Sequence, residues 1–335
     1  MSQPQLLSWC RQSLVMPEDV GTLLPVSGDA SFRRYFRFNV DQRSWIAVHA
    51  PPDKENNQAF VDVASLLADH GLRVPVLLAW DREQGFMLLT DFGDQLLWPL
   101  LNADSVDNWY HKSLAAVAQL QMIPLNHAKL PYYDSQRLQT EMRLFTEWFV
   151  EKLLDYSLSI AEQQRIDTVF SILTQSALAQ PQVVVHRDYH SRNLMVLANG
   201  ELGLIDFQDA VIGPCTYDPV SLLRDCYIAW PREDVERWLE NFRREYWPDE
   251  PAATFLRDFD WMGLQRHLKV LGIFARLNLR DGKPRYLDDL PLVLHYTLSV
   301  ARRYKEFNAF VQWFDEILMP KIVLQRWYKP LEMNV

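Results

Sequence analysis

Residues that can carry acid–base and metal chemistry gather in one short stretch of the chain. An apolar run, Val183–Val185, leads into a loop that contains Asp188, and Asn193 follows five residues later. A second apolar run, an Asn-Gly pair and a third apolar run then lead to Asp206. The Asn-Gly pair predicts a hairpin turn in which both central residues have positive φ, and such a hairpin brings Asn193 close to Asp206. Side-chain oxygens at these two positions suit a hard cation such as Mg²⁺.

These side chains predict phosphoryl transfer. Asn193 and Asp206 would hold Mg²⁺ against nucleotide phosphates, while Asp188 would receive the proton of an acceptor hydroxyl. The run from His186 to Asn193, followed by Asp206 and Phe207, matches the kinase signature H-R-D-x-x-x-x-N and D-F-x in residue type, order and spacing. The alternative is that Asp188 caps a turn and Asp206 pairs with a surface base, which would make the spacing accidental.

The segments around this stretch predict an α+β protein with a bilobal, protein-kinase-like fold. Up to about residue 92 the sequence predicts short strands and turns, with one helix from Gln58 to His70 that Gly71 ends. Beyond Asp94, apolar residues recur at helical spacing to about residue 326. We therefore expect a small β-rich N-terminal lobe over residues 1–92, which covers the nucleotide and ends in a hinge. A larger helical C-terminal lobe, residues 93–335, would carry catalysis and bind the acceptor.

Two segments of the N-terminal lobe are expected to contact the nucleotide. Small residues between 27 and 31 predict a turn whose backbone can approach phosphates. They are Ser27, Gly28, Asp29, Ala30 and Ser31. Backbone groups near Leu89 and Asp91, in the expected hinge, could hydrogen-bond the edge of an adenine, although an apolar strand that continues into a turn accounts for these residues equally well.

The cation that kinases usually place on their third strand, a lysine paired with a helix glutamate, is missing. The corresponding strand holds Val48 and His49, and the next helix has Asp62 but no glutamate. Either another base binds the nucleotide phosphates, or the metal alone neutralises their charge. The candidate bases are Lys54, Arg33 and Arg37.

A further carboxylate, Asp218, follows the D-F-x motif in the segment GPCTYDP. It either caps a helix that begins at Pro219 or has a direct catalytic role.

The composition excludes several classes of protein. The 335 residues are 48% hydrophobic and 23% charged, which is typical of a globular protein with a substantial core. A formal net charge of −9 argues against nucleic-acid binding, which needs a basic surface. The N-terminal residues lack a basic segment followed by an uninterrupted apolar run, so we expect no signal peptide. No window approaches the roughly 20 apolar residues that a membrane span needs.

Cysteine usage points to a reducing compartment. Cys10, Cys215 and Cys226 are too few and too scattered for a disulfide framework or a zinc site. We therefore expect a cytoplasmic protein without membrane association. Nothing in the sequence indicates an obligate protein partner.

Taken together, these motifs resemble the aminoglycoside phosphotransferase and choline kinase-like superfamily, over almost the whole chain. Within it the sequence is most similar to bacterial anomeric sugar kinases of cell-wall recycling, which phosphorylate N-acetylmuramate and N-acetylglucosamine at the anomeric hydroxyl. The matching segments are GDASFRRYFR, HAPPDKENNQAF, GFMLLTDFGD, VVVHRDYHSRNLM, LIDFQDAVIGPCTYDPVSLLRD and QRHLKVLGIFARLNLRDGKPRYL. The resemblance implies an ATP- and Mg²⁺-dependent kinase that acts on an amino sugar in peptidoglycan recycling.

Basic residues in the C-terminal lobe favour a sugar acid over a polycation as the acceptor. Between Gln265 and Arg285 there are many bases and one acid, Asp281, whereas a polycation would need carboxylates. Arg224 and Arg266 are the candidates for binding a lactyl carboxylate. Alternatively, these bases form a solvated helix face or bind carboxylates within the protein. Two other functions stay open: a kinase of another small alcohol (an aminoglycoside, choline or homoserine), or a nucleotide-binding regulator without catalysis.

Overall fold

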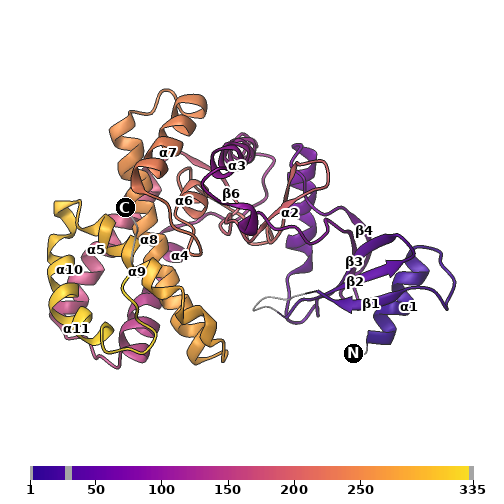
Figure 1. The fold of residues 1–335 in the computed structure, drawn as a ribbon, viewed down its shortest axis with the longest axis horizontal. Helices are drawn as coiled ribbons and strands as arrows, with labels where there is room; N and C mark the ends of the chain where they lie inside the picture. The colour runs from indigo at the N-terminus through magenta and orange to yellow at the C-terminus, as the bar shows by residue number, and fades with distance from the viewer. Residues whose placement is uncertain (1–2, 27–31, 332–335) are drawn as a thin grey trace. The chain divides into compact units, whose positions relative to one another are not determined.

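The computed structural model describes residues 3–26 and 32–331 of the chain, so the predicted phosphate-contacting residues Ser27–Ser31 lie outside the described residues. The chain forms two compact units (Figure 1). Unit 1 contains residues 1–105 and 191–210, and unit 2 contains residues 106–190 and 211–335. The boundary expected from the sequence, at residue 92, differs from this division because residues 93–105 and the hairpin after Ser191 fold with the strands of unit 1.

Unit 1 is built on an antiparallel sheet in the strand order β1-β2-β3-β5-β4. The strands are β1 (Thr22–Pro25), β2 (Arg34–Val40), β3 (Arg43–His49), β4 (Leu77–Asp81) and β5 (Phe86–Thr90). Helix α1 (Gln3–Ser13) packs Leu6 and Cys10 on one face of the sheet, where Phe38 and Phe86 lie. Helix α2 (Asn57–Asp69) begins at the Asn56 cap and ends where Gly71 has a φ of +80°. The predicted strands and α2 are confirmed, whereas α1 was not expected.

A hairpin distant in sequence completes unit 1. It consists of β7 (Leu194–Val196) and β8 (Leu202–Leu204). Met195 forms a bridge with Leu96, and the Leu204 N–H donates to the Arg73 carbonyl oxygen at 2.7 Å. These backbone bonds tie the hairpin to the strands that precede it.

The turn of this hairpin differs from the prediction in one respect. Of its two central residues, Gly200 has a φ of +78°, whereas Asn199 does not have positive φ. The Gly200 N–H donates to the Leu197 carbonyl at 2.8 Å, and the Leu197 N–H donates to the Glu201 carbonyl at 2.9 Å. This is the pattern of a three-residue loop with glycine at its last position, so Asn199 keeps an ordinary conformation.

Unit 2 is mainly helical (Figure 1). Its α-helices are α3 (Val106–Gln121), α4 (Ser135–Leu144), α5 (Ile160–Ala179), α6 (Tyr217–Leu223), α7 (Arg232–Tyr246), α8 (Ala252–Leu279), α9 (Leu290–Ala301), α10 (Asn308–Trp313) and α11 (Met319–Ile322). A π-helical segment, Phe145–Leu153, continues α4. One small sheet pairs β6 (Gln182–Val185) with β9 (Val211–Pro214).

Helix α8 is the centre of unit 2, because its 28 residues are buried on several sides by α4, α5, α6 and α9. Gly272 permits a close approach to the end of α4, since a Cβ at this position would lie 2.2 Å from the carbonyl carbon of Leu144. Only glycine lets the two backbones pass at this distance. Within the described part of the chain, none of the helices combines the length and apolar composition that crossing a bilayer requires.

Candidate active site

The loop that carries Asp188 is held by a buried carboxylate beneath it. Strand β6 ends at Val185, and the next two backbone N–H groups donate to Asp218: His186 to Oδ2 at 2.7 Å and Arg187 to Oδ1 at 3.0 Å. Asp218 is fully buried near the start of α6, and its side chain does not cap that helix. The expectation that Asp218 is a helix cap is therefore wrong; its carboxylate positions the loop.

This contact requires an unusual backbone. Arg187 has a φ of +77°, a conformation that costs a non-glycine residue roughly 1–3 kcal/mol and is typically retained at functional sites. Burial raises the pKa of Asp218 to about 7, against the two backbone hydrogen bonds that lower it, and the nearby charge of Asp188 raises it further. The loop conformation thus depends on a carboxylate that titrates near neutrality.

The Arg187 side chain reaches a second buried carboxylate, Glu141 on α4. The same carboxylate pairs with the Lys269 ammonium of α8 at 2.9 Å and accepts the hydroxyl of Tyr133. Lys269 also donates to the hydroxyl of Tyr217 at 3.2 Å. Burial acts to raise the pKa of Glu141, but Lys269 and Arg187 outweigh burial, and the pKa is lowered. Glu141 is therefore ionised and binds two cations.

Asp188 lies in the field of these cations. Burial acts to raise its pKa, but the charges of Lys269, His190, Arg187 and His186 outweigh burial and lower it. Asp188 is therefore a carboxylate at neutral pH, which is the form that can accept a proton or hydrogen bond from a hydroxyl. The motif itself indicated Asp188, whereas nothing in the sequence indicated Glu141, and Lys269 stood out only as one base among several.

In unit 1 the structure brings together the two predicted metal ligands at the open end of the β7–β8 hairpin. Asn193 directly precedes β7, and Asp206 follows β8. The Asn193 side-chain amide donates to Asp206 Oδ2 at 3.3 Å, and the Gln208 amide donates to Asp206 Oδ1 at 2.8 Å. The Ile205 N–H donates to the Asn193 carbonyl at 3.2 Å, which fixes their register. Asp206 has a φ of +63°, a second strained position in the motif.

Of the expected hinge residues, Leu89 lies within β5 and Asp91 directly follows it. Leu89 is buried within the sheet, where it pairs with Ile46 and Leu77. Asp91 accepts two bonds from the Arg37 guanidinium, at 2.6 and 3.2 Å, and Asp94 accepts a third at 2.8 Å. Arg37 therefore fixes the backbone after β5, and adenine binding at Leu89 and Asp91 stays a prediction.

The two arginines expected to bind substrate are both buried in unit 2. Arg224 pairs with the buried carboxylate of Asp260 and stacks on Phe259. Arg266 donates to the sulfur of Cys226 at 3.2 Å. The ion pair of Arg224 is of the kind that the alternative interpretation expects, in which these bases bind carboxylates within the protein. Contact of either arginine with a substrate stays a prediction.

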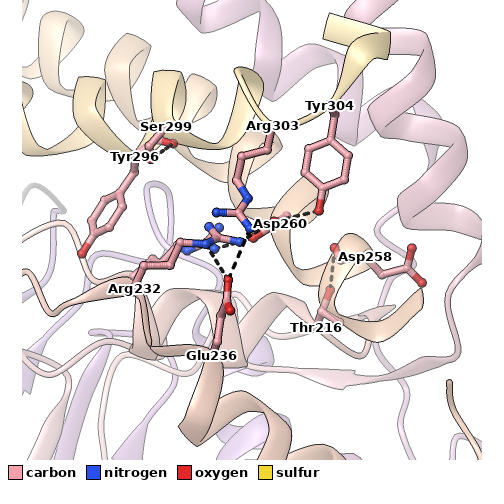
Figure 2. A network of polar contacts seen from close by, with 10 residues as sticks. Thr216, Arg232, Glu236, Asp258, Asp260, Tyr296, Ser299, Arg303 and Tyr304 are labelled. Carbon is pink, nitrogen blue, oxygen red and sulfur yellow. Dashed lines mark hydrogen bonds and ion pairs between the residues drawn. The ribbon is translucent and has the colours of Figure 1, made fainter. Parts of the chain in front are cut away.

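Asp260, the partner of Arg224, also belongs to a network of polar contacts with other residues. Figure 2 shows this network. Asp260 accepts from Arg232 at 2.9 Å and from the hydroxyl of Tyr304 at 2.7 Å. Glu236, one turn along α7 from Arg232, pairs with Arg232 and at 3.7 Å with Arg303. Residues of α7 and α8, with one that directly follows α6 and one that lies after α9, thus meet at one carboxylate that is wholly removed from solvent.

Comparisons with known proteins identify the family of the chain. The model of the phosphotransferase enzyme family matches residues 22–256. The N-acetylmuramate/N-acetylglucosamine kinase of Pseudomonas putida is 43% identical over 306 residues, which cover 89% of this chain and 88% of that protein. The kinase of the same name from Neisseria meningitidis serogroup B is 40% identical over 326 residues, covering 94% and 96%.

Solved structures show the same fold at low sequence identity. A spectinomycin phosphotransferase in complex with ADP and spectinomycin superimposes with a TM-score of 0.64 at 13% identity, over 90% of this chain and 98% of that one. An ethanolamine kinase of Plasmodium vivax has a TM-score of 0.64 at 12% identity, over 87% and 86%. These likenesses confirm the bilobal, kinase-like α+β fold. The family match over residues 22–256 and the relatives at 40–43% identity establish that the chain belongs to the phosphotransferase enzyme family.

Proposed function

We propose that this chain transfers the γ-phosphoryl group of ATP to the anomeric hydroxyl of N-acetylmuramate or N-acetylglucosamine, as a step of peptidoglycan recycling. The observation that carries the proposal is the 40–43% identity, over about nine-tenths of the chain, with relatives named N-acetylmuramate/N-acetylglucosamine kinase. Loop geometry supports a transferase, because the strained backbone at Arg187 and the contacts of Asp218 present an ionised Asp188.

Asp188 is assigned to the acceptor hydroxyl. Its carboxylate would accept a hydrogen bond from the hydroxyl, orient the oxygen for in-line attack on the γ-phosphorus, and take the proton as the new P–O bond forms. The leaving group is ADP. Because the pKa of Asp188 is lowered, its role is chiefly to orient the hydroxyl and to receive its proton late, when the hydroxyl has become acidic.

Asn193 and Asp206 fit a magnesium ion. Mg²⁺ is commonly held by one or two protein oxygens, with phosphates and water in its other positions. The 3.3 Å contact between the two side chains places a carboxylate oxygen beside an amide, and a half-turn of that amide exchanges its nitrogen for oxygen. Bound there, Mg²⁺ would neutralise charge on the phosphate oxygens.

The remaining assignments are part of the same proposal. The backbone near Leu89 and Asp91 would bind the adenine edge, and the segment from Ser27 to Ser31 would approach the phosphates. The protein would act on small molecules, without nucleic acid, membrane or an obligate protein partner. The cytoplasm supplies ATP and keeps thiols reduced, which suits the buried free thiols of Cys10, Cys215 and Cys226.

Replacement of Asp188 tests the proposal. We expect Asp188→Asn to lose at least about 100-fold in kcat, the usual contribution of a positioned proton acceptor, while MgATP binds with unchanged Kd. A suitable assay is ADP release with each amino sugar, alongside calorimetric binding of MgATP. Wild-type kcat in the variant would reject the role of Asp188.

A matched control is Asp209→Asn, an exposed aspartate close to the D-F-x motif in sequence. This variant should keep kcat within about twofold, since exposed substitutions are usually mild. Equal losses in both variants would mean that the assay reports a general disturbance of the fold.

A further inference from the structure

The side chain that binds the nucleotide phosphates in place of the usual strand lysine is still to be identified. The sequence lacks the usual strand lysine, and its three candidate replacements lie in unit 1, where their surroundings differ. Arg37 is engaged by Asp91 and Asp94 and also donates to the Gly93 carbonyl at 3.1 Å. Lys54 is exposed and lies 3.6 Å from the exposed Asp53. A phosphate-binding cation is expected to be buried and close to Asp206. Neither Arg37 nor Lys54 meets this expectation.

Arg33 has the required surroundings. It directly precedes β2, and its side chain is only 4% exposed. Its Nε lies 3.5 Å from Glu55 Oε2, and its Nη2 donates to the Asn56 carbonyl at 3.4 Å. The other oxygen of Glu55 accepts the Phe32 N–H at 3.0 Å. Glu55, which lies just before α2, thus binds both the backbone at Phe32 and the guanidinium of Arg33, next to the start of β2.

One chain of ring contacts and one electrostatic link connect Arg33 with Asp206. In the first, the guanidinium lies 5.3 Å from the ring centre of Phe60 on α2, and that ring lies 5.0 Å from the ring of Phe207, the neighbour of Asp206. In the second, the Tyr35 hydroxyl lies within the fields of both Arg33 and Asp206. Burial raises the pKa of Tyr35 to about 12, while Arg33 lowers it and Asp206 raises it.

From this placement we propose that Arg33, held by Glu55, is the side chain of this protein that binds the nucleotide phosphates. The inference rests on the proposed function, since it takes MgATP as the ligand and Asp206 as a metal ligand. An ion pair between Arg33 and Glu55 takes the place of a strand lysine paired with a helix glutamate. The strand position itself cannot do so, because Val48 is apolar and burial lowers the pKa of His49, which keeps it neutral.

Arginine suits this task for a physical reason. Its guanidinium keeps its charge when buried and offers a planar fork of donors that matches two phosphate oxygens. Glu55 supplies the opposite charge that a buried cation requires before the nucleotide arrives. The phosphates would then share the guanidinium with Glu55.

The test compares nucleotides with and without phosphates. Calorimetry would measure the Kd of MgATP and of adenosine for the wild-type chain, Arg33→Met and Arg33→Lys. Loss of a charge-assisted contact is expected to weaken MgATP about 10- to 100-fold in Arg33→Met, with adenosine unchanged within twofold. Arg33→Lys keeps the charge without the fork and should recover part of the loss. If Arg33→Met does not fold, an MgATP Kd within twofold of wild type in Arg33→Lys overturns the proposal.

Arg34→Met is the matched control, because the neighbouring arginine is exposed and alternation along the strand points it to the opposite face. Its Kd for MgATP should stay within twofold of wild type. An unchanged MgATP Kd in Arg33→Met, or an equal loss of adenosine binding, would overturn the role of Arg33. A selective loss in Arg37→Met or Lys54→Met would assign the task to that residue instead. A wild-type chain that binds no MgATP would overturn the proposed function itself.

Discussion

The buried pair of Glu141 and Lys269 gives the sharpest prediction about the architecture of the site. Glu141→Gln keeps the size of the side chain but removes the charge that faces both Lys269 and Arg187. Loss of one partner from a buried ion pair typically costs about 3–5 kcal/mol, because the remaining charge is left uncompensated. For a unit of roughly 200 residues, 3 kcal/mol corresponds to a fall in Tm of about 6–12 °C.

The double variant distinguishes a true pair from two separate effects. Lys269→Met removes one of the two cations, while Arg187 remains with Glu141. In Glu141→Gln/Lys269→Met no ammonium is left uncompensated, so its cost should be smaller than the sum of the single costs by about 2 kcal/mol. Urea unfolding of all four proteins, followed by fluorescence and circular dichroism, measures this coupling energy.

An exposed pair in the same unit is the control. Glu147 and Lys152 lie 2.9 Å apart with about half of each side chain exposed, and Glu147→Gln should change the free energy of unfolding by less than about 0.5 kcal/mol. Additive costs at Glu141 and Lys269, with a coupling energy below about 0.5 kcal/mol, would refute the account of this network.

Three further predictions concern the same unit. Asp218→Asn turns an acceptor toward a backbone N–H into a donor, so kcat should fall at least about 10-fold with the fold retained; an unchanged kcat would contradict its role in holding the loop. Because the folded pKa of Glu141 is lowered, its contribution to stability is present above its unfolded pKa of about 4.3 and is lost as pH falls through the folded value. Unfolding free energy should therefore drop less between pH 5 and 3 in Glu141→Gln than in wild type, and parallel curves would contradict this. Arg224→Met should destabilise the protein by about 3 kcal/mol, because Asp260 loses a buried partner, and unchanged stability would contradict this. A raised KM without loss of stability would instead favour substrate binding.

The sequence predicted what depends on local pattern. The spacing from Asp188 through Asn193 to Asp206 is a short-range signal, and the hairpin that the turn at Gly200 enforces brings the last two together. Strands of unit 1 carry alternating or continuous apolar runs, and α2 has a clear cap and stop. Such features follow from the backbone and from periodicity, so they could be recognised in one sequence.

Features that depend on tertiary packing could not be predicted. Glu141 and Lys269 form an ion pair although 128 positions separate them in sequence, and neither belongs to a motif. Asp218 looked like a helix cap, because a cap and a loop-binding carboxylate share the same local sequence. Helix α1 was missed because Leu6 and Cys10 are its only buried residues, which leaves a weak apolar stripe. The pairing of Arg33 with Glu55 depends on the tertiary fold, which brings Glu55 beside the start of β2.

The most direct test of the central claim is phosphorus NMR of the product made from MgATP and each acceptor in turn: N-acetylmuramate, N-acetylglucosamine, kanamycin, choline and homoserine. We expect turnover with the amino sugars, an acid-labile phosphate at the anomeric carbon, and product formation at least about 100-fold slower in Asp188→Asn. Turnover with kanamycin, choline or homoserine alone would contradict the sugar assignment, and binding of MgATP without transfer to any acceptor would contradict the kinase assignment for these substrates.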